Sequence, residues 1–443
     1  MKLLHYNMYQ KLKYTFAVCL LFTSIIVNAQ VTIQSPYSRF GIGNIKGSIL
    51  PQYRAMGGIS TGVFRQGGFN NINMQNPATY AGITATTLDI GLTGVITELK
   101  TSSQTDNSFN GSLSHVAFAF PLTRKSALSF GVLPYSQLGY DFKNTVKIGT
   151  TAANTKTVDY QYTGEGGLTK AYLGYGVQFG DHFRVGANVE YLFGNLSEKR
   201  ATEFVSDPGS INSSIESKNS VGGVSFSYGA QYDVRLNNKT SLVFGYSGSA
   251  NSKLNSEKSN VVTQYLNDAN GDPQSAFDTL SNVQNQGTNL KLPLVHNFGI
   301  SLQKDNKWLI GADYRMGKWS NLTIDNVNQG LQDTYGVSVG GQFTPDITAI
   351  NGYFKRVDYR LGFSYDKTYI QISNQDIKQQ AITVGLGLPL SSLSRNTFYK
   401  LNLTAELGKR GTVDNGLLQE KFINIHLGFT LNDLSWFRRF KFD

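Results

Sequence analysis

From about residue 84 to residue 432, apolar and polar residues alternate in repeated runs along the chain. In residues 183–190, for example, the odd positions hold Phe, Val, Ala and Val, and the even positions hold Arg, Gly, Asn and Glu. Successive side chains on a β-strand point to opposite faces, so each run has one apolar and one polar face. Repeated in series, the pattern favours a transmembrane antiparallel β-barrel, with the apolar face toward lipid and the polar face toward the lumen.

The number of runs and the lengths of their connections support this all-β prediction. Short connections such as 180–181 and 236–238 alternate with longer ones such as 201–213 and 255–289. Outer-membrane barrels have an even number of strands and keep their short turns in the periplasm, so both termini are expected there. The fourteen predicted strands span residues 84–99, 112–121, 126–147, 155–179, 182–200, 214–235, 239–254, 290–303, 307–324, 333–344, 354–373, 377–389, 397–409 and 419–432.

The first 29 residues have the composition of a secretory signal peptide. Lys2, Lys11 and Lys13 precede a mainly apolar stretch at 15–27, and residues 27–29 offer a Val-Asn-Ala cleavage site. Removal of this segment also removes Cys19, the chain's one cysteine, so no disulfide or thiol ligand is expected. The predicted organisation is a signal peptide at 1–29, an N-terminal segment at 30–83 and a barrel at 84–443.

Composition changes this picture little. The mean hydropathy of −0.24 resembles that of a soluble protein, but a barrel strand contributes only every second residue to lipid. No stretch after residue 30 is long and apolar enough for a membrane helix. The net charge of +10 is spread singly over strands and turns, without a basic helix or RNA-binding signature, so nucleic acid is not an expected partner.

Residues 30–83 lack the alternation and carry two short motifs. The first motif is Arg54-Ala55-Met56-Gly57-Gly58, in which two glycines permit a sharp turn packed closely against a wall. The second is Asn76-Pro77-Ala78, which predicts a turn leading into the first strand. Ordinary loop turns are the alternative interpretation of both.

These two motifs, placed just before fourteen predicted strands, resemble the N-terminal signature of the FadL-type outer-membrane transporters of hydrophobic compounds. The resemblance implies a hatch inside the barrel and passive diffusion of small hydrophobic molecules across the outer membrane. It also implies a kink in the third strand that opens a lateral gap toward the bilayer. Pro134 lies in that predicted strand, where proline cannot donate to the ladder. A bulge without a transport role is the alternative for Pro134.

The predicted lumen face is more polar than a tunnel for fatty acids would require. Acidic and basic residues occur together on it, which favours a structural network in the wall, although an arginine could bind a carboxylate headgroup. The candidate lumen-facing polar residues are Arg184, Asn188, Glu190, Asp313, Arg315, Arg356, Asp358 and Arg360.

Enzymatic and metal sites are not expected, and neither is a cofactor. His115 and His426 both face the predicted lumen, but no metal-ligand spacing accompanies them. Ser114 and His115 are adjacent and therefore face opposite ways on a strand, so they cannot form a nucleophile–base pair. Asp268, Asn270 and Asp272 have calcium-ligand spacing, but Pro273 stands where an EF-type loop requires glycine.

A second function remains open beside hydrophobic transport. The barrel could anchor or scaffold a partner in secretion or outer-membrane assembly, through loops 201–213 and 255–289 or the periplasmic face. The expected partners are therefore the lipid bilayer and either a small hydrophobic ligand or a protein.

Overall fold

The fold is described from a computed structural model, which covers residues 35–149, 155–205, 209–268, 271–390 and 396–436. The signal-peptide prediction and Asn270 lie outside these ranges. The N-terminal segment contains η1 (Pro36–Arg39), β1 (Asn44–Ile45), α2 (Pro51–Arg54), η2 (Gln66–Gly68) and η3 (Pro77–Gly82). The strands that follow are β2 (Thr86–Lys100), β3 (Thr105–Thr123), β4 (Ser126–Ile148), β5 (Lys156–Phe179), β6 (Phe183–Phe204), β7 (Asn212–Asn237), β8 (Thr240–Ser249), β9 (Ser252–Tyr265), β10 (Asp278–Leu292), β11 (Val295–Lys304), β12 (Trp308–Gly317), β13 (Thr323–Ile324), β14 (Val327–Asn328), β15 (Thr334–Phe343), β16 (Asp358–Ile372), β17 (Gln375–Leu390), β18 (Thr397–Gly411) and β19 (Gln419–Asp433).

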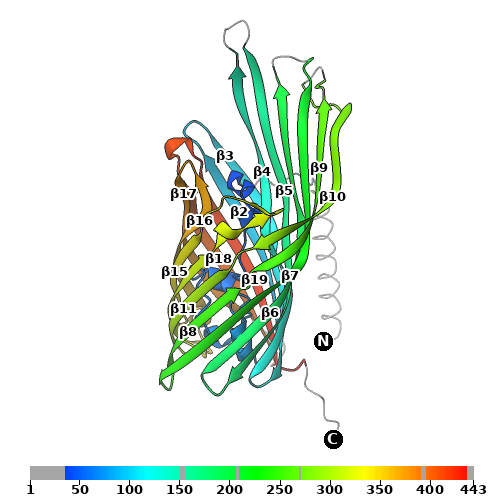
Figure 1. Ribbon diagram of the computed structural model, residues 1–443. Helices are drawn as coiled ribbons and strands as arrows, with labels where there is room; N and C mark the ends of the chain where they lie inside the picture. The colour runs from blue at the N-terminus through cyan, green and yellow to red at the C-terminus, as the bar shows by residue number, and fades with distance from the viewer. Residues whose placement is uncertain (1–34, 150–154, 206–208, 269–270, 391–395, 437–443) are drawn as a thin grey trace, which may run out of the picture. The chain divides into compact units, whose positions relative to one another are not determined.

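A closed antiparallel barrel of fourteen strands confirms the predicted fold class. Its wall consists of seven strands, β2–β8, followed by β11, β12 and β15–β19 (Figure 1). The last strand pairs with the first from Gln419↔Lys100 to Asp433↔Thr86, which closes the barrel. Closure leaves no sheet edge along this seam, as a membrane-spanning sheet requires.

The outer surface of the barrel is apolar, as the alternation predicted. Leu173, Val189 and Ile310 are each more than half exposed, and their sequence neighbours point inward. A soluble protein rarely exposes such a continuous apolar surface, so this exterior is that of a barrel in lipid. None of the helices within the described ranges has the length and apolar composition needed to cross a membrane.

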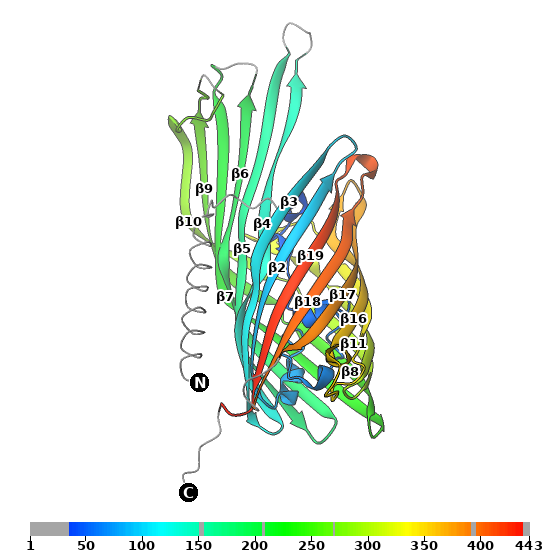
Figure 2. The same cartoon turned by 180° about the vertical axis from the view of Figure 1, so that it is seen from behind.

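One side of the barrel is much taller than the other. Strands β4–β7 continue upward together with β9 and β10, beyond the tips of β2, β3 and β17–β19 (Figures 1 and 2). β9 follows β8 and pairs with the upper part of β7, while β10 pairs with β9 and leads into β11. We call β4–β7, β9 and β10 above the barrel the tall wall.

Regions predicted as long loops form strands of the tall wall in the structure. Most of 255–289 forms the β9–β10 hairpin, and 201–213 shrinks because β6 ends at Phe204 and β7 begins at Asn212. Alternation is missing there because residues at both odd and even positions are mostly polar, and alternation marks a strand only when one face is apolar. The predicted loop near 100–111 likewise lies mostly within β3, which begins at Thr105.

Four predicted strands are interrupted or shortened. The strand predicted at 239–254 divides into β8 and β9, which residues 250–251 separate. The strand predicted at 290–303 breaks at Pro293, between β10 and β11, since proline cannot donate to the ladder. The strand predicted at 307–324 ends at Gly317 and is followed by η5 (Trp319–Asn321) and β13. The strand predicted at 354–373 begins only at Asp358, after η6 (Tyr353–Arg356).

Candidate functional site

Residues 35–83 pack inside the barrel and contact many of its strands. The backbone N–H groups of Ser60 and Thr61 both donate to Oδ2 of Asp313 at 2.8 Å, and the N–H of Gly57 donates to Oγ1 of Thr383 at 2.8 Å. Charge-assisted bonds to a buried carboxylate are stronger than neutral ones. The segment is therefore attached to β17 at Gly57 and to β12 at Ser60 and Thr61.

The Arg54–Gly58 motif shows why glycine is needed at this turn. Gly57 and Gly58 have φ values of 70° and 86°, which disfavour other residues. A Cβ on Gly57 would also lie 2.6 Å from the carbonyl oxygen of Phe363. The predicted close approach to the wall is present. Ala55 and Met56 are fully buried beside it.

The Asn76–Ala78 motif forms a helical start rather than a simple turn. The Asn76 side chain accepts the N–H of Ala78 at 3.1 Å and so caps η3, with Pro77 at the favoured first position. Its Nδ2 donates to the Thr61 carbonyl at 2.8 Å, which ties the second motif to the turn that follows the first. In the wall, a Cβ on Gly186 would lie 2.4 Å from the Pro77 carbonyl oxygen.

Most of the predicted polar lumen residues lie inside the barrel, but they bind one another or the N-terminal segment. Asp358 pairs with Arg360 at 2.9 Å and with Lys400 at 2.8 Å. Arg184 pairs with Asp233. Asp313 holds the N-terminal segment, as described above. These groups form a structural network because a buried charge is costly without a partner.

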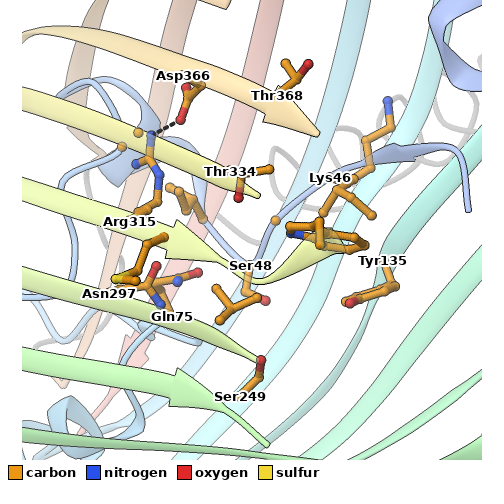
Figure 3. A pocket seen from close by; sticks show the side chains of 18 of the residues that line it. Lys46, Ser48, Gln75, Tyr135, Ser249, Asn297, Arg315, Thr334, Asp366 and Thr368 are labelled. Atoms are coloured by element: carbon orange, nitrogen blue, oxygen red, sulfur yellow. Dashed lines mark hydrogen bonds and ion pairs between the residues drawn. The ribbon is translucent and has the colours of Figure 1, made fainter. Parts of the chain in front are cut away.

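The remaining members of the predicted set divide between cavity and surface. Glu190 pairs with Lys170 at 3.2 Å beside the larger cavity. Arg315 pairs with Asp366 at 2.8 Å beside the same cavity (Figure 3). Asn188 donates to Ser227 at 3.0 Å. The prediction for Arg356 is wrong: it lies in η6, before the strand begins, and stacks over Tyr353.

Two cavities lie on either side of residues 44–49. The larger has a volume of about 400 Å³ and lies toward β7, β12, β15 and β16; Figure 3 shows Lys46, Ser48, Tyr135 and other residues that line it. The smaller has a volume of about 200 Å³ and lies toward β2, β3 and β19. Both include Arg54 and Glu406 in their lining. The N-terminal segment thus forms the partition between them.

Two cations of that partition lie near the Glu406 carboxylate but form no ion pair with it in the described part of the chain. Arg54 donates to the backbone carbonyls of Ile49 at 3.0 Å and Lys46 at 2.5 Å. Among the described residues, neither Arg54 nor Lys46 forms an ion pair. Burial, reinforced by the neighbouring charges of Arg54 and Arg410, lowers the pKa of Lys46 to about 8. The partition can therefore stabilise an acidic group in either cavity.

The pairing of β3 with β4 ends beside the smaller cavity. Their ladder runs from Thr123↔Ser126 to Val116↔Val132 and goes no further, although both strands continue. The next residues of β4, Leu133 and Pro134, line the smaller cavity. The register of β4 against β5 also shifts between Pro134 and Ser136, as expected of a bulge at proline.

The N-terminal segment lies against the free edge of β4 above this point. β1 pairs with β4 through Asn44↔Gln137 and Ile45↔Ser136, and the N–H of Lys46 donates to the Tyr135 carbonyl at 3.0 Å. No strand pairs with the facing edge of β3 over residues 105–115 in the described structure. We call this interval between β3 and β4 the gap. It is flanked by residues 44–46 on one side only.

His115 and His426 are each held by a carboxylate. His426 lies 3.4 Å from Glu406, and His115 Nε2 lies 2.7 Å from Asp89 Oδ1. No group of three or more metal-ligating side chains occurs in the described part of the chain. His115 Nδ1 also lies 3.2 Å from Ser114 Oγ, so the expectation that these neighbours face opposite ways is wrong.

Sequence reasoning missed the residues that shape the cavities. Lys46 belongs to a stretch without periodicity, and Glu406 and Arg410 lie on a strand whose polar face was not singled out. Nothing in their local sequence marks them, because the cavities arise only where the N-terminal segment crosses the lumen.

One known family matches nearly the whole chain. A family model described as BamG matches residues 8–443. The chain belongs to the BamG family. No curated protein matches the sequence of this BamG-family barrel.

Solved structures confirm the FadL-type fold of the BamG-family barrel. The toluene transporter TbuX of Ralstonia pickettii is 15% identical with a TM-score of 0.54, over 88% of this chain and 99% of that one. The P. putida toluene transporter TodX is 14% identical with a TM-score of 0.54, over 87% of this chain and 98% of that one. A Pseudomonas aeruginosa FadL homologue is 13% identical with a TM-score of 0.53, over 89% of this chain and 99% of that one.

Proposed function

We propose that this barrel is an outer-membrane channel through which small hydrophobic molecules diffuse passively, leaving the lumen sideways through the gap. The observation that carries the proposal is the end of the β3–β4 ladder at Val116↔Val132, next to a cavity that Leu133 and Pro134 line. A molecule in that cavity has a route to the bilayer that does not cross the apolar wall. The solved structures of similar fold include proteins described as toluene transporters, which supports this proposal.

The cavities also define the molecules that fit. About 400 Å³ accommodates a small organic compound, and the lining combines apolar groups such as Ile49 and Met316 with polar ones. Arg54 and Lys46 at the partition favour compounds that add an acidic group to an apolar body. The N-terminal segment would act as the hatch that separates the two cavities.

The orientation follows the sequence expectations. A signal peptide at residues 1–29 would export the chain, and both termini would lie in the periplasm. The tall wall would then rise on the extracellular side, since long connections of outer-membrane barrels lie there.

Proteoliposomes test the channel function. We expect the purified protein to accelerate the passage of the apolar fluorophore N-phenyl-1-naphthylamine into vesicles. Pro134→Val restores an N–H and allows β4 to pair more regularly, and should slow this passage by roughly tenfold. Pro121→Val is the matched control, because Pro121 pairs with Ala127 beside a register shift of its own and lines neither of the two cavities described above. Equal rates for the wild type and Pro134→Val would contradict the lateral route.

The tall wall supports a second candidate, a barrel that anchors a protein partner. Within the described residues, its outer strand β10 pairs only with β9 over residues 278–288, and Leu280 and Val283 on it are 58% and 43% exposed. An unpaired strand edge with apolar side chains readily joins another chain. Replacing residues 257–286 with a short turn should leave probe passage intact. It should also remove any protein that co-purifies stoichiometrically from solubilised membranes, whereas retention of that protein would contradict docking at this edge.

A further inference from the structure

Three side chains beside the gap form one continuous hydrogen-bonded row. Oδ1 of Asp89, on β2, lies 2.7 Å from Nε2 of His115, on β3. Nδ1 of the same imidazole lies 3.2 Å from Oγ of Ser114. A serine, a histidine and a carboxylate in this order are the components of a nucleophile, a base and the group that orients the base.

A β-bulge makes this arrangement possible for two adjacent residues. The β2–β3 register passes from Gly91↔His115 directly to Leu92↔Leu113, so Ser114 is the extra residue. A bulge re-aims side chains, which places Ser114 and His115 on the same side of the strand. Gly91 provides the space for the imidazole, because a Cβ there would lie 2.3 Å from Cε1 of His115.

The surroundings of Asp89 determine which imidazole nitrogen carries the proton. Asp89 is fully buried and also accepts hydrogen bonds from Oγ1 of Thr430 at 2.8 Å and Nε2 of Gln52 at 3.3 Å. A carboxylate surrounded by donors acts as an acceptor, so Nε2–H of His115 donates to it. The Nδ1 lone pair is then available to accept the hydroxyl proton of Ser114, as a general base requires.

Ser114 is the accessible end of the row, since His115 and Asp89 are fully buried. Ser114 and His115 line the smaller cavity together with Leu133 and Pro134, next to the gap. Leu113, the neighbour of Ser114, is 51% exposed on the outer surface of the barrel. An amphiphile could therefore keep its acyl chain in the bilayer while its head reaches Ser114.

We propose that Ser114, His115 and Asp89 form a hydrolytic site for carboxylic esters of lipids. Ser114 Oγ attacks the ester carbonyl carbon while His115 Nδ1 takes the hydroxyl proton. The tetrahedral intermediate then breaks the bond to the alcohol oxygen, which receives that proton from His115. Water, deprotonated by His115, attacks the resulting acyl-serine and releases the fatty acid, and Ser114 regains its proton.

Each residue has a distinct role in this reaction. Ser114 and His115 are catalytic because they touch the reacting atoms, whereas Asp89 is a positioning residue that holds the imidazole. The edge of β3 that faces the gap has no strand partner in the described structure, so its backbone N–H groups can stabilise the oxyanion. The activity does not depend on the proposed channel function.

Labelling and hydrolysis by the purified full-length barrel test this proposal. The probes are a biotinylated fluorophosphonate, which reacts with activated serines, and p-nitrophenyl esters of butyrate and palmitate in mixed micelles. We expect labelling at Ser114 and ester hydrolysis, and Ser114→Ala should lower both by about 10³-fold. Asp89→Asn should lower kcat with little change in KM, because it disturbs the imidazole without touching the ester.

Ser112→Ala is the matched control, since Ser112 lines the same cavity but has no histidine in hydrogen-bond range among the described residues. It should retain hydrolysis and labelling. Heat-modifiable migration on gels verifies that each variant forms a barrel. A folded wild-type barrel that neither reacts with the fluorophosphonate nor exceeds Ser114→Ala in hydrolysis would overturn the proposal. Passage of N-phenyl-1-naphthylamine in Ser114→Ala separates this result from failure of the channel.

Discussion

The two edges of β4 differ in how far they pair with a neighbouring strand. Toward β5, β4 pairs along its whole length from Ser126↔Val177 to Ile148↔Lys156, with one bulge beside Pro134. Toward β3, its ladder ends at Val132, and the N-terminal segment takes over part of the edge through β1. A barrel in lipid gains stability from every satisfied backbone group, so an interrupted seam suggests a function. The contrast suggests that β4–β5 serves the wall and β3–β4 serves passage.

The strongest test of this contrast fixes the N-terminal segment to the interrupted edge. Asn44 and Gln137 are directly paired, so the double variant Asn44→Cys/Gln137→Cys can form a disulfide. If movement of residues 44–46 opens the gap, forming the disulfide should reduce probe passage by roughly tenfold. The disulfide would hold residue 44 against β4, because a structural disulfide resists reduction. The measurement is passage of N-phenyl-1-naphthylamine before and after reduction. Asn44→Cys alone is the control, and full passage in the oxidised double variant would contradict movement of the segment.

A second test displaces the N-terminal segment from the wall. A Cβ on Gly245 would lie 1.9 Å from the Thr61 carbonyl oxygen, so Gly245→Val should push residues 60–62 away. We expect a loss of stability of about 3 kcal/mol in the attachment of the segment, as for overpacking of a core. Single-channel conductance in planar bilayers should rise, and proteases should cleave the segment.

Gly287→Val is the control for that experiment. Gly287 lies on β10, and a Cβ added there would meet no described atom within 4 Å, so the larger side chain should be tolerated. Unchanged conductance and protease resistance in Gly245→Val would show that residues 60–62 do not depend on close contact with the wall.

The smallest expected effect concerns pH. The pKa of Lys46 is about 8, so Lys46 is charged at neutral pH and loses its proton above about pH 8. Binding of decanoate should weaken by less than about tenfold as the pH rises through this value, because one charge contact is lost. Lys46→Gln should bind more weakly at neutral pH and show no such dependence, as measured by calorimetry. If decanoate binding by Lys46→Gln kept the pH dependence of the wild type, the titrating group would be one other than Lys46.

Raising the pH, which weakens ligand binding through Lys46, has the opposite effect on folding stability. The unfolded chain holds Lys46 at its ordinary pKa of 10.5, and folding lowers that value. The unfolded state therefore binds the proton more tightly, and Lys46 favours folding increasingly between about pH 8 and pH 10.5.

The wall of the barrel could be predicted from the sequence because alternation directly reports one apolar and one polar face. The prediction failed in β9 and β10, where residues of both faces are mostly polar, and at Arg356, where η6 replaces the start of a strand. The close approach of Gly57 to the wall was predictable from the two glycines. The row formed by Asp89, His115 and Ser114 was not, because a bulge shifts the phase of a strand without changing its composition.

The most direct test of the lateral route is a crystal structure of the barrel soaked with bromobenzene, with anomalous scattering used to place the bromine. We predict a bromine peak in the smaller cavity beside Leu133 and Pro134, at the interval where β3 and β4 no longer pair. A peak confined to the outer apolar surface, with the smaller cavity empty of bromine, would contradict the lateral route.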